Sequence, residues 1–234
     1  ICQLYDHYFE MTGAYFGAKS GCEPIHILWD SDTDVIMAVN NTPAACRGLT
    51  AEARIYNFAG KEVWHKSVKL GLPATSVQDC FPITRPTAVS PVFFVKLTLK
   101  QGKKILSDNF YWSGAKGASC EALNDLPPVK LDAEASHSFT NQVHEISVRV
   151  TNPVQTVALA IRLKVQRSGS GDRVLPVFYS DNYFSLLPGE SKTVSVEFAD
   201  KDLAGEAPKL IAEGWNIPAQ EIPLVEITLA RHAP

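Results

Sequence analysis

The apolar residues of this 234-residue chain recur at every second position along much of its length. The clearest run lies at 157–165, where the apolar set is Val157, Leu159, Ile161, Leu163 and Val165. Successive side chains of a β-strand point to opposite faces, so this run predicts a strand with one apolar face. Its other face carries Arg162 and Lys164. A chain dominated by this pattern is constrained to fold as sheets that bury one face each.

The same period returns in short runs that turn-forming residues separate. Apolar runs occupy 25–29, 35–39, 51–58, 62–70 and 92–99, and alternating apolar sets occupy 146–150, 194–198 and 225–229. Beyond residue 24 no stretch has the spacing of an amphipathic helix. Many short strands at a spacing of about ten residues predict an all-β fold built from sandwiches.

A weak internal repeat predicts two sandwiches rather than one. The sequence Ser-Asp-Asn-Phe-Tyr at 107–111 returns as Ser-Asp-Asn-Tyr-Phe at 180–184. Between the two copies, the stretch 113–128 is rich in Gly, Ser and Pro and has little periodicity. We therefore expect the domain boundary to lie in that stretch.

The first 16 residues are unusually aromatic, since they contain Tyr5, Tyr8, Phe9, Tyr15 and Phe16. Residues 13–22 predict a short helix that ends at Gly21 and Pro24. Apolar residues cover more than one stripe of this helix, so we expect it to pack on more than one side. Nothing within residues 1–22 supplies enough apolar surface to cover it.

Composition excludes several classes of partner. The chain is 45% hydrophobic and 20% charged, with a net charge of −3, which is ordinary for a globular protein and gives no basic surface for nucleic acid. No apolar run approaches the roughly 18 residues of a membrane span. The opening sequence lacks an initiator Met and the basic start of a signal peptide, so we expect the chain to begin inside a longer protein.

The five cysteines give no sign of a disulfide framework or a zinc site. They are Cys2, Cys22, Cys46, Cys80 and Cys120, an odd number without any CxxC spacing. We expect them to be small buried apolar residues, with at least one thiol free or paired outside the chain.

No metal or cofactor is expected. Asp30, Asp32 and Asp34 begin like a calcium loop, but Val35 and Asn41 stand where that loop needs Gly and Glu. A solvated turn is the favoured interpretation, and an irregular calcium site is the alternative. The histidines show no HxH or HExxH pairing, so we interpret them as surface or strand residues; they are His7, His26, His65, His137, His144 and His232.

Catalytic motifs are also missing from the sequence. There is no GxSxG, Walker or GxGxxG pattern. Glu10 and Glu23 lie near the aromatic segment, but nothing in the sequence brings them together as the paired carboxylates of a glycosidase. We therefore do not expect either to act as an acid or base here.

The tryptophans allow two interpretations. They are Trp29, Trp64, Trp112 and Trp215, and their flat rings could stack on sugar rings. The favoured alternative is packing in the core or between domains, with each indole N–H hydrogen-bonded.

Three stretches at the start resemble a known enzyme family. Residues 3–8 (QLYDHY), 13–19 (GAYFGAK) and 23–27 (EPIHI) resemble the end of the catalytic barrel in glycoside hydrolase family 2. The branch is that of β-mannosidases, exo-β-D-glucosaminidases and mannosylglycoprotein endo-β-mannosidases.

The rest of the chain resembles the domains that follow this barrel. Residues 107–112 are similar to the closing strand of the first immunoglobulin-like domain, and 173–191 with 213–216 are similar to the last one. The resemblance implies three parts. Residues 1–23 would be the tail of the last barrel strand and the last barrel helix, 24–115 an immunoglobulin-like β-sandwich, and 116–234 a C-terminal immunoglobulin-like β-sandwich.

The resemblance also implies a function. Such enzymes are retaining hydrolases of β-mannosides or β-glucosaminides, and their catalytic glutamates lie on earlier barrel strands, which no position here matches. We therefore expect this chain to be a non-catalytic C-terminal portion that braces the barrel and is inactive alone. Tyr5 and Asp6 would lie at the rim of the barrel and could approach the substrate in the intact enzyme, with a structural role for both as the alternative. By analogy, the location would be extracellular, periplasmic or vacuolar/lysosomal.

Two rival functions remain open. One is a free-standing β-sandwich that binds carbohydrate or acts in adhesion, and the other is an independent hydrolase with an unrecognised site. An exposed coplanar pair of tryptophans would favour the binding module, whereas buried indoles would favour the brace. The expected partners are the barrel and N-terminal domains of the same enzyme and, through it, a carbohydrate, with no nucleic acid and no membrane.

Overall fold

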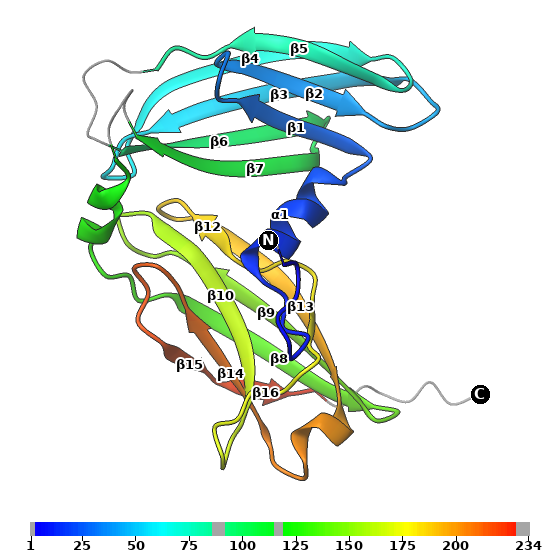
Figure 1. Ribbon diagram of the computed structural model, residues 1–234, viewed down its shortest axis with the longest axis vertical. Helices are drawn as coiled ribbons and strands as arrows, with labels where there is room; N and C mark the ends of the chain where they lie inside the picture. The colour runs from blue at the N-terminus through cyan, green and yellow to red at the C-terminus, as the bar shows by residue number, and fades with distance from the viewer. Residues whose placement is uncertain (1–2, 86–91, 115–118, 228–234) are drawn as a thin grey trace. The chain divides into compact units, whose positions relative to one another are not determined.

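The computed structural model describes residues 3–85, 92–114 and 119–227, which form two compact units (Figure 1). One unit is Gly17–Leu126, and its sheets are called the first sandwich. The other joins Ile1–Phe16 to Pro127–Pro234. In this second unit, residues 3–16 are called the leading segment and residues 127–227 the second sandwich.

The first sandwich contains two antiparallel sheets. The three-stranded sheet has the order β1-β2-β5, formed by β1 (Ile25–Asp30), β2 (Val35–Asn40) and β5 (Ser76–Pro82). The four-stranded sheet has the order β4-β3-β6-β7, formed by β3 (Cys46–Tyr56), β4 (Glu62–Leu72), β6 (Val92–Gln101) and β7 (Lys104–Gly114). A 3-10 helix, η1 (Glu121–Asp125), follows them.

Alternating residues of these strands build one core. Ile27 and Ile36 from the three-stranded sheet are fully buried in the same cluster as Ile55 and Leu97 from the four-stranded sheet. The apolar runs of the sequence thus became strands with their apolar faces turned inward, which confirms that prediction.

The second sandwich also contains two sheets. The sheet β12-β10-β14-β15 is formed by β10 (Ala158–Arg167), β12 (Phe184–Leu186), β14 (Pro208–Glu213) and β15 (Gln220–Ile222). The sheet β11-β13-β9-β8-β16 is formed by β8 (Asp132–Thr140), β9 (Val143–Thr151), β11 (Phe178–Tyr179), β13 (Ser191–Ala199) and β16 (Leu224–Glu226). A second 3-10 helix, η2 (Asp200–Leu203), follows β13.

The core of the second sandwich follows the predicted alternation with one correction. All five apolar residues of 157–165 are buried, as expected. However, Ala160 has a positive φ of 52° and the pairing of β10 with β12 shifts register there. Because of this bulge, Ala158 joins Ile161 in the core cluster and Leu159 does not. The single apolar face predicted for this strand is therefore interrupted.

The last predicted strand is also corrected. Leu224 packs against the core, whereas Val225 and Ile227 are exposed. β16 pairs in parallel with β8 at the edge of its sheet, and Val225 lies opposite Ser136. Val225 and Ile227 therefore do not form the buried face that the sequence predicted, and Leu229 lies outside the described residues.

The predicted helix is present as α1 (Gly13–Gly21). Phe16 is the buried residue of this helix, while Ala14 and Ala18 are exposed. The described part of the chain thus covers one side of α1 and leaves the side with these alanines open. No helix in this part is long and apolar enough to span a membrane.

Candidate functional site

The leading segment folds back on itself as a small loop. Tyr5 and Met11 form an isolated antiparallel bridge, and between them Asp6 accepts hydrogen bonds from the backbone N–H groups of Tyr8 (2.8 Å) and Glu10 (3.0 Å). These bonds favour the charged form, so the backbone N–H of Glu10 above all holds the pKa of Asp6 below its usual value. Asp6 therefore shapes the loop.

Glu10 joins the leading segment to the second sandwich. One carboxylate oxygen accepts from the guanidinium of Arg162 in β10, and the other accepts from Arg173. Arg162 also binds Glu213 at 3.1 Å, and Lys164 binds the other oxygen of Glu213 at 2.7 Å. The result is a charge network in which every member has an opposite partner.

Apolar packing supports this attachment. Met11 and Phe16 are buried, and the ring centroid of Phe16 lies 6.1 Å from that of Tyr183 in the second sandwich. A Cβ atom on Gly13 would lie 3.6 Å from the Tyr183 ring, so the helix start is close to that side chain. The guanidinium of Arg162 also lies over the Tyr183 ring, 5.9 Å from its centroid. One acidic residue and two apolar residues thus hold the leading segment in place.

Other aromatic side chains of the leading segment are turned to solvent. Tyr8 is 59% exposed and Phe9 is 71% exposed, and Leu4 and Tyr5 are also exposed. Phe9 adopts a positive φ of 63°, a conformation that is uncommon for a bulky residue. Grouped exposed apolar side chains are typical of interaction surfaces. We call these four residues the exposed patch.

The two predicted substrate-binding residues lie next to each other in this loop. The ring of Tyr5 is half exposed at 5.3 Å from Tyr15, and Asp6 has its oxygens engaged by the loop N–H groups and by Arg173 at 3.6 Å. A contact between either residue and a substrate stays a prediction.

The two glutamates that we set aside as a catalytic pair have separate structural partners. Glu10 binds the two arginines of the second unit. Glu23 accepts a hydrogen bond from the Ser107 hydroxyl at 2.6 Å and lies 3.1 Å from Nδ1 of His26. These contacts connect the start of β1 to β7. Both carboxylates are therefore engaged within the folds that carry them.

The candidate metal residues form a turn. Asp30 accepts from the backbone N–H of Asp32 and from the hydroxyl of Thr33, and Asp34 pairs with Arg85 at 2.8 Å. In the described part of the chain, no group of three His, Cys, Asp or Glu side chains is arranged to hold a metal ion.

The histidines are strand residues in three buried cases. His26 lies in β1, His137 in β8 and His144 in β9. His137 and His144 face each other with 2.9 Å between Nε2 and Nδ1, and His144 binds Asp200 at 3.0 Å. His232 lies outside the described residues.

The prediction of buried cysteines is wrong for two positions. Cys22 and Cys120 are exposed, and Cys46 and Cys80 are partly exposed. All four are free thiols. Burial of the Cys80 thiol raises its pKa to about 11. Cys2 lies outside the described residues. Small apolar character did not decide burial here, because these residues lie at strand edges and in connecting segments.

The prediction for the tryptophans is wrong in part. Trp29 is buried, but its indole N–H has no hydrogen-bond partner among the described residues. Trp112 in the first sandwich and Trp215 in the second are about half exposed rather than packed in a core.

Sequence reasoning did not identify Arg162 and Arg173 as functional residues. Arg162 had been recognised only as part of the polar face of a strand, and 152 positions separate it from Glu10. No local pattern reports a pairing over this separation, so only the fold could reveal it.

Two family models match the chain. The exo-β-D-glucosaminidase Ig-fold domain matches residues 109–217, and the mannosidase Ig/CBM-like domain matches residues 35–114. The two matches fall on the second and first sandwiches in turn.

Curated relatives extend the match to almost the whole chain. An exo-β-D-glucosaminidase from Streptomyces avermitilis is 32% identical over 247 residues, which cover 94% of this chain and 27% of that protein. A mannosylglycoprotein endo-β-mannosidase from Lilium longiflorum is 26% identical, over 92% of this chain and 29% of that protein. The chain thus spans little more than a quarter of the relatives it matches.

Solved structures share the fold. The exo-chitosanase CsxA from Amycolatopsis orientalis superposes with a TM-score of 0.86 at 29% identity, over 94% of this chain and 29% of that chain. A β-D-mannosidase from Dictyoglomus thermophilum gives a TM-score of 0.63 at 17% identity, which shows a common fold. The chain therefore carries the two immunoglobulin-like domains of the exo-β-D-glucosaminidase and mannosidase branch of glycoside hydrolase family 2.

Proposed function

We propose that this chain is the non-catalytic C-terminal portion of a retaining family 2 glycosidase and braces its catalytic barrel. In this proposal residues 1–23 are the end of the barrel, and the sandwiches at 24–115 and 116–234 follow it. Support comes from the relatives, which are glycosidases about four times longer than the matched region.

The observation that carries the proposal is the two-sided character of the leading segment. Glu10, Met11 and Phe16 hold one side of it on the second sandwich. The exposed patch stays open: Phe9 is 71% exposed, and Tyr8 is 59% exposed although its ring also contacts the Arg173 guanidinium at 5.3 Å. A segment that contacts both the second sandwich and the barrel would fix the position of one relative to the other. Burying the exposed patch would stabilise the contact with the barrel by roughly 25 cal/mol per Å2 of apolar surface.

The proposal gives Tyr5 and Asp6 a place near the substrate. Active sites of (β/α)8 barrels lie at the C-terminal ends of the strands, where the tail of the last strand would emerge. Asp6 would act there by fixing the loop that positions the Tyr5 ring, since its oxygens already accept the loop N–H groups.

The parent substrate is a β-glucosaminide or a β-mannoside. Exo-β-D-glucosaminidases recur among the relatives, from Streptomyces, Amycolatopsis and Arthroderma, and these favour the glucosaminide.

The bracing role is tested by mixing this chain with the separately produced N-terminal portion of the same enzyme. We expect a stable complex at micromolar concentration and glycosidase activity in the complex. Replacing Tyr8 with Ser and Phe9 with Asn should weaken association, because both rings belong to the exposed patch, and Asn tolerates the positive φ at position 9.

The control is Val77→Thr, which removes an exposed apolar side chain from β5 of the first sandwich. This change should leave association unaltered. A mixture that shows no complex by analytical ultracentrifugation would count against the bracing role.

A carbohydrate-binding module is the second candidate function. The ring of Trp112 in the first sandwich and that of Trp215 in the second each support it singly and not as a coplanar pair, because an exposed indole suits contact with a sugar face. Loss of oligosaccharide binding on replacing either ring with Ala, without loss of association with the barrel, would support this role.

A further inference from the structure

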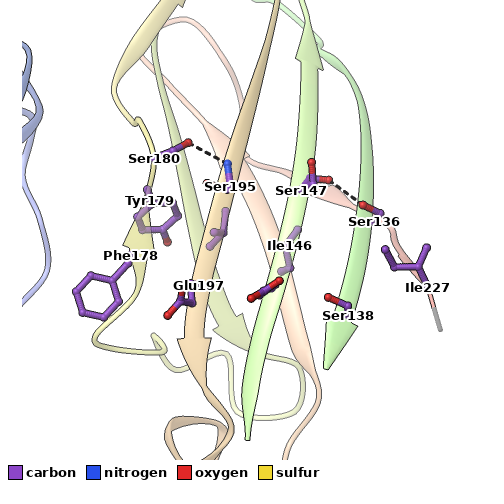
Figure 2. Close-up of a pocket in the computed structure, with 12 residues that line it drawn as sticks. Ser136, Ser138, Ile146, Ser147, Phe178, Tyr179, Ser180, Ser195, Glu197 and Ile227 are labelled. Carbon is purple, nitrogen blue, oxygen red and sulfur yellow. Dashed lines mark hydrogen bonds between the residues drawn. The ribbon is translucent and has the colours of Figure 1, made fainter. Parts of the chain in front are cut away.

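The outer face of the five-stranded sheet in the second sandwich carries a groove of about 530 Å3 (Figure 2). Strand alternation explains its lining. Ala135, Ile146 and Val196 point into the core, so their neighbours along each strand point outward. Figure 2 shows Phe178 on one side of the groove and Ile227 on the other.

The register of the strands arranges the outward residues in two rows across the sheet. One row runs Ser138, Glu145, Glu197 and Phe178, each directly opposite the next. The neighbouring row contains Ser136, Ser147 and Ser195, and the hydroxyl of Ser180 accepts from the backbone N–H of Ser195 at 2.9 Å.

The row of serines forms the floor of a longer trough. A second hollow of about 540 Å3 shares Ser136 and Ser147 with the first and continues over Arg149 and Thr193. The hollows adjoin because serine side chains are short, whereas the flanking rows carry longer ones. The trough therefore crosses several strands and suits an extended ligand.

Two carboxylates in this groove face each other without a compensating charge. Glu145 in β9 and Glu197 in β13 are direct cross-strand partners on the outer face. Within the described residues, neither glutamate forms an ion pair. Like charges directly opposite each other destabilise a sheet, so a cation bound between them would relieve a cost that the free protein carries.

An independent observation points to a ligand with hydrogen-bonding groups. Ser138 is only 9% exposed and lies on the outward row beside Glu145. Its hydroxyl lines the groove and has no hydrogen-bond partner among the described residues. The Ser138 hydroxyl opens onto the groove and is therefore available to exchange a hydrogen bond with a ligand hydroxyl there.

We infer that this groove binds a linear oligosaccharide of β-linked glucosamine. The ammonium group of one residue would lie between Glu145 and Glu197, sugar hydroxyls would bond the serine row, and a ring face would contact Phe178. The choice of an amino sugar over a neutral one rests on the proposed function, through the glucosaminidase relatives, and on the charge of the groove. A serine hydroxyl can both donate and accept a hydrogen bond, and so can a sugar hydroxyl, so the serine row suits a sugar ligand.

The test is a titration of the full chain with a β-1,4-linked glucosamine hexamer. Binding is measured by isothermal titration calorimetry and by the NMR chemical shifts of the backbone amides in the serine row. The work is done in weakly acidic buffer, in which the amino groups of the glucosamine hexamer carry a positive charge. The N-acetylglucosamine hexamer and the β-1,4-mannose hexamer serve as neutral probes. We expect binding of the glucosamine hexamer, weakened by added salt, and at least tenfold weaker binding of both neutral probes.

Variants locate the site. Glu145→Gln and Glu197→Gln should each weaken binding about tenfold, which corresponds to the loss of one hydrogen bond to a charged group. Each should also raise the melting temperature, since the like-charge pair is removed, so weaker binding cannot result from unfolding. Glu221→Gln is the matched control, because Glu221 lies in the other sheet and pairs with Lys209.

Several results would overturn the inference. These are the absence of hexamer binding at millimolar concentration, equal binding of charged and neutral hexamers, or unchanged binding in both glutamine variants. Shifts of the serine row on adding the N-terminal portion of the enzyme would assign the groove to a protein partner instead. A chain that binds glucosamine hexamer but does not associate with that portion would retain the groove and lose the bracing role.

Discussion

The carboxylate of Glu10 accepts a hydrogen bond from the guanidinium of Arg162, which lies 152 positions further along the chain. This pair closes the leading segment onto β10 of the second sandwich, and Arg173 binds the other oxygen. The leading segment is thus attached to the second sandwich through its charged side chains as well as its apolar ones.

Replacing Glu10 with Gln should release the leading segment. The change removes the charge that two guanidinium groups share and leaves Arg162 partly buried beside a neutral group. We expect a loss of about 2 kcal/mol in the free energy of unfolding of the second unit, the scale of hydrogen bonds to charged groups. Urea unfolding measures the loss, and hydrogen exchange at residues 3–16 should accelerate. The surface pair of Lys209 and Glu221 provides the control, since its removal should change stability by less than about 1 kcal/mol.

Phe16→Ala should destabilise the second unit by about 3 kcal/mol, because it removes a buried ring that contacts Tyr183. Phe9→Asn removes a ring of equal size from an exposed position and should change stability by less than about 0.5 kcal/mol. Thermal unfolding of the two variants gives the comparison. Equal effects would contradict the packing described for the leading segment.

The loop of the leading segment should open in acid. The backbone N–H of Glu10, the largest cause, and that of Tyr8 lower the pKa of Asp6 in the folded state. A carboxyl with a lowered folded-state pKa contributes stability above its unfolded pKa of about 3.9, and the contribution is lost as the pH falls through the folded value. We expect hydrogen exchange at Tyr8 and Glu10 to increase below about pH 4. Asp6→Asn should remove this pH dependence, and a loop that stays closed in acid would contradict it.

The second sandwich should lose stability as histidine becomes protonated. Burial, followed by the neighbouring His144, lowers the pKa of His137, while Glu226 acts in the opposite direction. The unfolded chain therefore binds a proton more readily than the folded one below the ordinary histidine pKa of about 6.5. The free energy of unfolding decreases as the pH is lowered through that range. Asp200 lies 3.0 Å from Nε2 of His144 and is, with Glu226, an acidic group beside the two histidines.

Chemical unfolding at a series of pH values tests this expectation. His137→Gln should flatten the dependence between about pH 5 and 7. His65→Gln, which changes an exposed histidine of the first sandwich, should leave it in place. An unchanged slope in the His137 variant would show that the pair does not control acid stability.

Much of the fold could be predicted because strand formation is a local property. The alternation at 146–150 and 194–198 places Val148 and Val194 in the core as expected, and the helix at 13–21 lies where Gly21 and Pro24 indicated an end. The resemblance to family 2 enzymes was confirmed by both domain matches. The domain bounds and the substrate contacts of Tyr5 and Asp6 stay predictions.

The errors occurred where the surroundings override the local pattern. A bulge at Ala160 exchanged the positions of Ala158 and Leu159 relative to the core. At the C-terminal edge, pairing with β8 turns Leu224 toward the core and leaves Val225 exposed on the outer face beside Ser136. Exposure of Trp112 and Cys22 likewise depended on what lies next to them and not on their own apolar character.

The sequence by itself determined that this chain forms strands with apolar and polar faces, two sandwiches and an aromatic leading segment, because a side-chain period of two is set by the backbone of each strand. Only the tertiary structure decided which outward residues meet. The opposition of Glu145 and Glu197 and the pairing of Glu10 with Arg162 depend on the register and packing of strands far apart in the chain. A shift of one residue in register would turn every side chain to the other face, so no local pattern can specify these sites.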